Sequence, residues 1–161
     1  MTIKVGDKIP EATFMQMTDK GPAPVPAADL FKGKKVVLFA LPGAFTPTCS
    51  AKHVPGFVEN ADALKAKGVD AIACVSVNDA FVMGAWGKDQ KVGDKVMMLA
   101  DGNADFTKKL GLEMDASGFG MGIRSKRYSM VVEDGTVKAI NVEPNPSTAD
   151  VSGAEQLLKS L

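Results

Sequence analysis

The cysteine at position 49 ends a stretch of chain whose residue types suit nucleophilic chemistry. The stretch reads Pro-Gly-Ala-Phe-Thr-Pro-Thr-Cys from Pro42 to Cys49, follows a strand-like apolar run and precedes a helix-like one. That order predicts a sulfur at the positive end of a helix, where a thiolate is favoured over a thiol. Thr46 lies three residues before the sulfur, and Pro42 and Pro47 stiffen the loop. We therefore expect Cys49 to act as an ionised nucleophile.

His53 follows Cys49 by four residues and would share its helix face. A Cys/His pair can also indicate a cysteine hydrolase or half of a metal site. A hydrolase needs an oriented base, a structural zinc site needs about four ligands, and the chain has only one histidine and two cysteines. We expect His53 to shape the pocket edge or make a local hydrogen bond, not to act as a base. We expect neither a metal nor another cofactor.

Taken singly, Thr46 also suits an ordinary helix cap and the prolines suit loop punctuation. Together, at this spacing, the residues from Pro42 to Cys49 resemble the active-site loop of the peroxiredoxins, in particular the type II or peroxiredoxin-5 branch. The resemblance covers nearly the whole chain and is weakest at residues 15–30 and 112–121. The other matching segments are Ile3 to Asp7, Asn78 to Met83, Trp86 to Lys88 and Ala139 to Glu143.

The resemblance implies a thiol peroxidase that reduces hydrogen peroxide and small alkyl hydroperoxides. The Cys49 thiolate would attack one peroxide oxygen and become a sulfenic acid. The family has an arginine at the start of a late strand, and Arg127, directly before Tyr128, matches it. Arg127, Thr46 and loop N–H groups would stabilise the leaving oxygen, while Pro42 would close the pocket.

Further residues of the motif are expected to support this site. The N–H groups around Thr48 are unpaired donors at a helix start, Phe45 belongs to the same loop, and Arg124 matches a recurrent arginine of the branch. A solvated strand end is the alternative for Arg124 and the preferred interpretation for Lys126.

Cys74 lies among apolar strand-forming residues, so we interpret it as a buried, inert thiol. The alternative is a partner that forms a disulfide with Cys49. Branch members that carry an internal resolving cysteine have it in the C-terminal loop, where this chain has Val151. We therefore expect an external thiol to regenerate Cys49, with glutathione and glutaredoxin as the first choice and thioredoxin as the second.

Two other functions stay open at this point. A peroxide sensor would share the Cys49 chemistry and pass its oxidation to a partner protein by disulfide exchange. A catalytically inactive thioredoxin-like interaction module would keep only the fold. The family also suggests a homodimer that packs its active-site edges together through Phe45 and the region of Phe81.

The elements that must position these residues alternate between strand and helix. Lys35 to Leu41 and Ala71 to Val77 read as buried strands. Between them, a helix over 49–67 should end at Gly68 and kink at Pro55. The next helix should be capped by Asn78 or Asp79 and carry an apolar stripe of Phe81, Val82, Ala85 and Trp86. The remaining expected elements are a strand over 96–100, a helix over 104–110, an irregular stretch over 113–122, a hairpin of 128–132 and 136–142, and a helix over 154–161.

Periodicity alone predicts an α/β sandwich, and the resemblance sharpens this to a thioredoxin-like fold. We expect one domain over residues 1–161, with a central mixed β-sheet flanked by helices, an N-terminal extension and an inserted β-α unit. Residues 1–34 should form extended loops and short edge strands because of their prolines.

The charge balance and the cysteine count limit the classes of binding partner and the compartment that we expect. The formal net charge is zero and the isoelectric point is about 6.6, which gives no support for nucleic-acid or anionic-membrane binding. Two cysteines are too few for a disulfide scaffold, and we see neither a signal-like segment nor a run of ~18 apolar residues. We expect a cytoplasmic protein with no membrane association.

Overall fold

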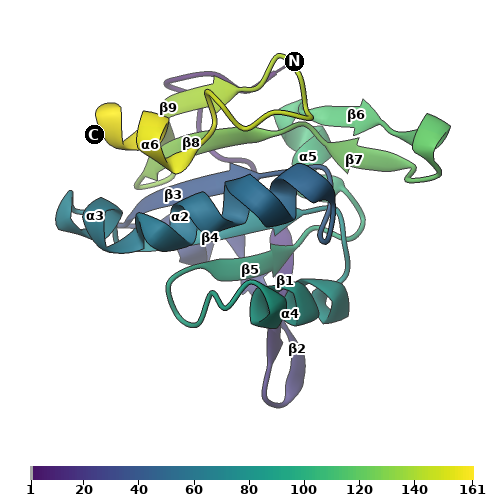
Figure 1. Ribbon diagram of the computed structural model, residues 1–161. Coiled ribbons are helices and arrows are strands. Elements are labelled where there is room, and N and C mark those ends of the chain that lie inside the picture. The colour runs from purple at the N-terminus through teal and green to yellow at the C-terminus, as the bar shows by residue number, and fades with distance from the viewer. Residues whose placement is uncertain (1) are drawn as a thin grey trace.

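The structure is a computed structural model that describes residues 2–161. It contains a seven-stranded sheet in the order β2-β1-β5-β4-β3-β8-β9 and a separate two-stranded sheet of β6 and β7 (Figure 1). The strands are β1 Thr13–Thr18, β2 Gly21–Pro26, β3 Lys35–Ala40, β4 Ala71–Ser76, β5 Met97–Ala100, β6 Glu113–Asp115, β7 Ile123–Ser125, β8 Tyr128–Glu133 and β9 Thr136–Val142. The helices are α1 Ala27–Phe31, the π-helix η1 Cys49–His53, α2 Val54–Glu59, α3 Ala61–Ala66, α4 Ala80–Asp89, α5 Asp105–Leu110, the 3-10 helix η2 Ser117–Phe119 and α6 Ala154–Lys159.

The centre of the large sheet is parallel and its two sides are antiparallel. β4 pairs in parallel with both β3 and β5, while β8 runs antiparallel to β3 and forms a hairpin with β9. The sequence β3-α2-β4-α4-β8-β9-α6 is the expected thioredoxin-like plan, which is confirmed. The hairpin of β1 and β2 with α1 is the N-terminal extension, and β5 with α5 is the inserted unit.

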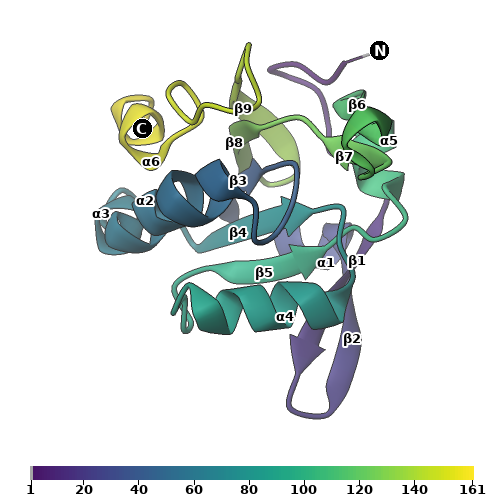
Figure 2. The ribbon, with the colours of Figure 1, turned by 45° about the vertical axis from the view of Figure 1, so that its right-hand side comes forward.

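Helices cover both faces of this sheet, and β3 supplies side chains to each face in turn. Val37 and Phe39 pack with residues of α2, α3, α4 and α6, whereas Val36, Leu38 and Ala40 pack with residues of α1 and α5. Figure 2 shows α2, α3 and α4 together on one side of the sheet. The near-continuous apolar run of β3 follows from this burial on both faces.

The helix after Cys49 differs from the expectation of one helix kinked at Pro55. Helical residues run without a break from 47 to 59, but their middle is the π turn η1, in which the Val54 N–H bonds to the Cys49 carbonyl. Pro55, which has no N–H to donate, follows that turn directly. The break comes later, at Asn60 between α2 and α3, where φ is −98° and ψ is 7°. The predicted kink at Pro55 is therefore replaced by a wide turn before it and a break after it.

Helix α4 begins as expected, because the Asp79 side chain accepts a hydrogen bond from the Val82 N–H. Its predicted apolar stripe is confirmed at Trp86 but wrong at Phe81 and Ala85: the buried residues are Ala80, Met83, Trp86 and Gly87, while Phe81 is 66% exposed and Ala85 is exposed. Two glycines on the inner face explain the difference. A Cβ on Gly84 would lie 2.8 Å from the Met17 Cβ, and one on Gly87 would lie 2.9 Å from the Met98 Cγ.

The stretch 113–122, predicted to be irregular, contains β6 and η2, and β6 pairs antiparallel with β7. Gly120 and Gly122 have φ values of +71° and +69° between these strands, a conformation that glycine adopts without strain. Three-residue strands are too short to leave a periodic pattern in a sequence. Within residues 2–161, no helix is long and apolar enough to cross a membrane.

Candidate active site

The register of the sheet brings the Arg127 segment to the loop that carries Cys49. Ala40, the last residue of β3, pairs with Tyr128, the first residue of the antiparallel β8. The chain beyond Ala40 and the chain before Tyr128 therefore leave the sheet at the same edge. Residues 41–46 cross that edge into the helix that holds Cys49, and Arg127 enters β8 from it.

Thr46 starts the helix that positions the sulfur. Its carbonyl accepts the first helical bond from the Ser50 N–H at 3.0 Å, and Pro47 is the first residue with helical assignment, a position that proline favours. The N–H groups of Thr48 and Cys49 in the first turn have no intrahelical carbonyl to bind. The Thr46 hydroxyl donates to the Gly43 carbonyl at 2.8 Å, which leaves its oxygen free to accept a hydrogen bond.

Phe45 and Gly43 show how tightly this loop is built. Phe45 has a φ of 62°, which is uncommon for a residue with a side chain, and its ring is 54% exposed. A Cβ on Gly43 would lie 2.9 Å from the Arg124 Nη1. A side chain at position 43 would therefore displace the end of the Arg124 side chain from its present place.

Arg127 directs its whole guanidinium at the site. Its Nη2 donates to the Cys49 Sγ at 3.0 Å, its Nη1 to the His53 Nδ1 at 2.9 Å and its Nε to the Pro146 carbonyl at 2.9 Å. The residue is only 2% exposed, and within residues 2–161 no carboxylate forms an ion pair with it. No carboxylate of the described residues therefore balances this buried charge, and the guanidinium donates directly to the Cys49 sulfur.

His53 is neutral and has one defined tautomer. Arginine only donates and a carbonyl only accepts, so the Nδ1 accepts from Arg127 and the Nε2–H donates to the Ser152 carbonyl at 3.1 Å. Burial, then the charge of Arg127, lower the pKa of His53 to about 3, against the opposing effect of the Ser152 bond. Because Arg127 occupies the ring's free lone pair, this geometry does not offer His53 as a base for Cys49.

The remaining predicted residues surround this centre. Pro42 is buried and its carbonyl accepts from the Arg124 Nη1 at 3.3 Å, while the Arg124 Nε donates to the Met121 carbonyl at 3.0 Å. The Thr48 hydroxyl donates to the Ser147 carbonyl at 2.7 Å. Lys126 is exposed, as its solvated interpretation requires.

The two cysteines are both free and fully buried. Cys74 lies opposite Phe39 in the parallel pair of β3 and β4 and shares the apolar core that contains Cys49. Burial raises the pKa of the Cys74 thiol well above its ordinary value. This is the environment of an unreactive thiol.

The sequence interpretation missed the segment 144–153, in which it considered only the absence of a cysteine at Val151. Three backbone carbonyls of this segment, from Pro146, Ser147 and Ser152, bind active-site side chains. Every residue type has a backbone carbonyl, so a pattern of residue types does not predict these contacts. The acid Glu143 at the end of the matching segment Ala139 to Glu143 was the available signal, because it is buried and binds this segment.

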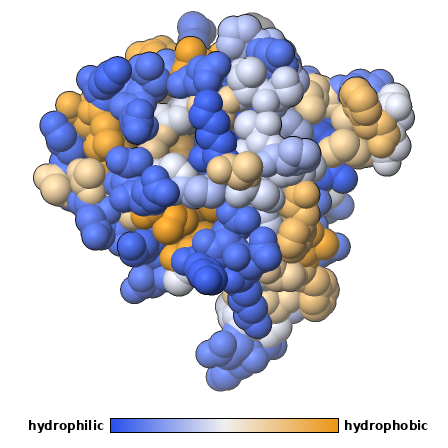
Figure 3. Space-filling model, in the orientation of Figure 1, coloured by the Kyte–Doolittle hydropathy of each residue, from blue (hydrophilic) through white to orange (hydrophobic). Residues whose placement is uncertain are grey.

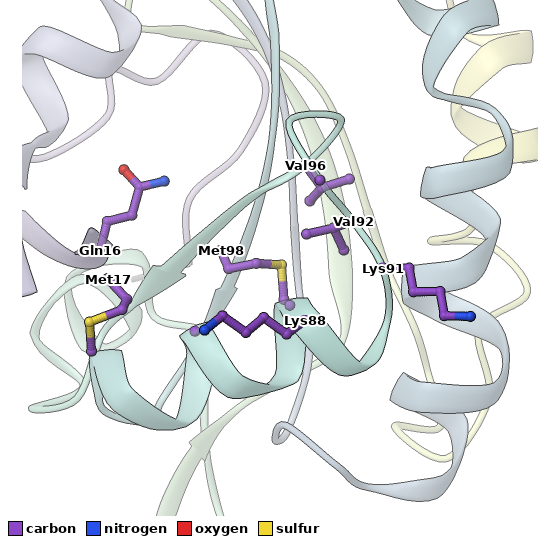
Figure 4. A pocket seen from close by; sticks show the side chains of 10 residues that line it. Gln16, Met17, Lys88, Lys91, Val92, Val96 and Met98 are labelled. Atoms are coloured by element: carbon purple, nitrogen blue, oxygen red, sulfur yellow. The ribbon is translucent and has the colours of Figure 1, made fainter. Parts of the chain in front are cut away.

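A hollow of about 250 Å³ lies elsewhere, beside α4, and is lined by residues of β1, α4 and 91–98 (Figure 4). Met17, Lys88 and Met98 are among its lining residues, and none of its lining comes from the loop 42–49 or from 143–153. It is therefore separate from the Cys49 centre. Within residues 2–161, no group of three or more His, Cys, Asp or Glu side chains is arranged to hold a metal ion.

A thioredoxin-like fold with a buried cysteine bound by an arginine defines the class of protein. The Redoxin family matches residues 4–158 of the chain. Peroxiredoxin-2E, chloroplastic, of Arabidopsis thaliana is 51% identical over 164 residues, which cover 99% of this chain and 70% of that protein. Peroxiredoxin-2B of the same plant is 47% identical over 160 residues, which cover 99% and 98%.

A solved structure, reduced Prx3 in complex with H2O2 from Vibrio vulnificus, is 56% identical, with a TM-score of 0.93 and coverage of 99% of both chains. The chain belongs to the Redoxin family, among the peroxiredoxins of the type II and peroxiredoxin-5 kind, and is a thiol-dependent peroxidase.

Proposed function

We propose that Cys49 is the residue that attacks the peroxide. Its thiolate sulfur bonds to one peroxide oxygen as the O–O bond breaks, so sulfur loses two electrons and the second oxygen leaves with them. The leaving oxygen takes up a proton to become water or an alcohol, and Cys49 is left as a sulfenic acid. The contact of 3.0 Å between Arg127 Nη2 and Cys49 Sγ, made inside a buried site, is the observation that carries this assignment.

The groups around the sulfur have different roles in binding the peroxide. Arg127 and the first-turn N–H groups of Thr48 and Cys49 are fixed donors toward the oxygen that gains charge. The Thr46 hydroxyl oxygen can accept a hydrogen bond from the peroxide O–H. Pro42 shields the sulfur, and Arg124 holds the Pro42 carbonyl.

Phe45 lines the pocket mouth, and His53 holds Arg127 in place as a neutral ring. Phe45 is half exposed at the loop, whereas His53 is 1% exposed behind the guanidinium. No metal or other cofactor is required for this reaction, because the electrons come from the thiol.

Regeneration is proposed to need an external thiol. The thiol attacks the sulfenic sulfur, water leaves, and a second thiol then releases reduced Cys49 from the mixed disulfide. Cys74 is a poor internal partner because it is fully buried in the sheet. By the family resemblance, Val151 stands where those branch members that have an internal resolving cysteine carry it. Glutathione with glutaredoxin is the first choice of reductant and thioredoxin is the second.

A matched pair of variants tests the assignment. Turnover of hydrogen peroxide is measured with Cys49→Ser and Cys74→Ser, each supplied with glutathione and glutaredoxin or with thioredoxin and its reductase. We expect Cys49→Ser to lose all turnover and Cys74→Ser to keep it, faster with glutaredoxin. Full turnover by Cys49→Ser would refute the assignment, and rapid oxidation without turnover in either system would favour the peroxide sensor.

We further propose a cytoplasmic homodimer that buries the region of Phe45 and Phe81. Both rings are more than half exposed, and the face in Figure 3 shows apolar patches separated by hydrophilic side chains. Two free thiols suit a reducing compartment. Light scattering at micromolar concentration tests the dimer: a monomeric mass, or a dimer unchanged by Phe81→Lys, would contradict it.

A further inference from the structure

We propose that Glu143 is a positioning residue of the peroxidase site, which acts through the segment 144–153 on His53 and Arg127. The proposal rests on the proposed role of Cys49. Glu143 touches neither the sulfur nor the guanidinium side chain, so its influence has to pass through the contacts described next.

Glu143 follows the last residue of β9 and is tied to Arg127 by its backbone, since its N–H donates to the Arg127 carbonyl at 2.9 Å. Glu143 is buried, with 5% of the residue exposed. Within residues 2–161 it forms no ion pair. A buried carboxylate without a cation must be satisfied by hydrogen-bond donors.

Within residues 2–161, the side-chain and backbone donors to that carboxylate come from the segment that follows. One oxygen, Oε2, accepts from the Ser152 N–H and from the Ser152 hydroxyl, each at 2.7 Å. The other, Oε1, accepts from the Thr148 hydroxyl at 3.2 Å. Glu143 therefore closes 144–153 into a loop whose middle, at Thr148, and far end, at Ser152, are held on one carboxylate.

The same loop supplies the acceptors that orient the site. Pro146 accepts from the Arg127 Nε, Ser147 from the Thr48 hydroxyl and Ser152 from the His53 Nε2–H. The loop also makes a side-chain ion pair, between Lys52 and Asp150 at 3.0 Å, whose side chains are 60% and 67% exposed. An ion pair this exposed adds little rigidity, so the buried carboxylate is the stronger anchor.

A path of four hydrogen bonds, through three residues, leads from the carboxylate to the sulfur. Ser152 binds Glu143 and fixes His53, His53 fixes Arg127, and Arg127 binds the Cys49 sulfur. Without the carboxylate, the Ser152 N–H and hydroxyl would be buried without a partner. The segment would have to shift to satisfy them. The Pro146 carbonyl, which accepts from Arg127, and the Ser152 carbonyl, which accepts from His53, would shift with it.

The test uses Glu143→Ala and Glu143→Gln. A carboxamide can turn its oxygen to Ser152 and its NH2 to the Thr148 hydroxyl, which can accept, so the Gln variant should rescue much of the effect. Glu133→Gln is the charge-matched control at the far, exposed end of β8. Leu110→Ala is the stability-matched control, because Leu110 is buried in the core on the other face of the sheet.

Two reactions of Cys49 are followed in each variant: oxidation by hydrogen peroxide, and alkylation by iodoacetamide as a function of pH. We expect Glu143→Ala to slow oxidation by about 10- to 100-fold, the range of a misplaced catalytic donor. We also expect its alkylation profile to move to higher pH, because the thiolate loses its fixed cation. Glu143→Gln should stay within about fivefold of the parent protein, and both controls should keep the parent's alkylation profile.

Unchanged oxidation and alkylation in a folded Glu143→Ala protein would overturn the proposal. So would an equal loss in Leu110→Ala, since the effect would then be one of stability. If Glu143→Ala does not fold, Ser152→Ala decides, because it removes one donor and keeps the carbonyl: a smaller loss in the same direction supports the proposal and no loss overturns it. A parent Cys49 that is alkylated but does not react with peroxide would refute the proposed function while alkylation still reports on Glu143.

Discussion

The buried, neutral His53 predicts that the protein loses stability in mild acid. The perturbation is His53→Gln, which removes the only histidine of the chain while keeping groups that can accept from Arg127 and donate to Ser152. Any stability change that depends on imidazole titration must disappear in this variant.

The magnitude follows from the two pKa values. The pKa of His53 is lowered to about 3 in the folded protein, against about 6.5 in an unfolded chain. Between these values the unfolded state binds the proton and the folded state does not, so the free energy of unfolding falls as pH falls. His53 therefore contributes stability that is complete above pH ~6.5 and decreases below it, by about 2 kcal/mol between pH 7 and pH 5.

Urea unfolding at constant ionic strength, at half-unit steps from pH 7 to pH 5, measures this loss. The parent protein should lose about 2 kcal/mol more than His53→Gln over that interval. Burial raises the pKa of the Asp101 carboxyl, an effect of opposite sign, but both proteins share it and it cancels in the difference. Parallel curves for the two proteins would refute the reasoning, because His53 would then carry its proton in the folded state or lie exposed.

Three further predictions concern the reacting centre. Arg127→Lys should slow peroxide oxidation of Cys49 by about 10- to 100-fold in stopped-flow measurements, because one ammonium cannot reproduce a planar fork bound to Cys49, His53 and Pro146; a loss under twofold would contradict this. Cys74→Ala should keep full turnover while lowering the free energy of unfolding by about 1 to 2 kcal/mol from the cavity it leaves, and loss of turnover in the folded variant would revive Cys74 as a participant. Trp86, the only tryptophan, donates to the hydroxyl of Ser50 at 3.0 Å, so peroxide should change its fluorescence in the parent protein and not in Cys49→Ser.

The strands that frame the site could be predicted from the sequence. The apolar run that became β3 and the turn at Asp134 and Gly135 between β8 and β9 are strong local signals, and both residues of that turn have positive φ. Local signals do not say which strands pair, so the meeting of Arg127 with Cys49 depended on the family resemblance.

Features that depend on close packing or on backbone atoms could not be predicted. The buried face of α4 is set by Gly84 and Gly87, which contact two methionine side chains. A pattern of apolar side chains does not identify a glycine as a residue that faces the core. The π turn at Cys49–His53 reflects a choice among carbonyl acceptors that side-chain patterns do not record. The backbone carbonyls that bind Arg127, Thr48 and His53 could not be predicted either, because every residue type has one.

The most direct test of the central claim is to trap the sulfenic acid. The reduced protein is treated with one equivalent of hydrogen peroxide in the presence of a sulfenic-acid reagent, and the adduct is mapped by mass spectrometry. The account predicts rapid labelling at Cys49, none at Cys74, and none at all in Cys49→Ser. A label on Cys74, a disulfide between Cys49 and Cys74, or an unreactive Cys49 would contradict it.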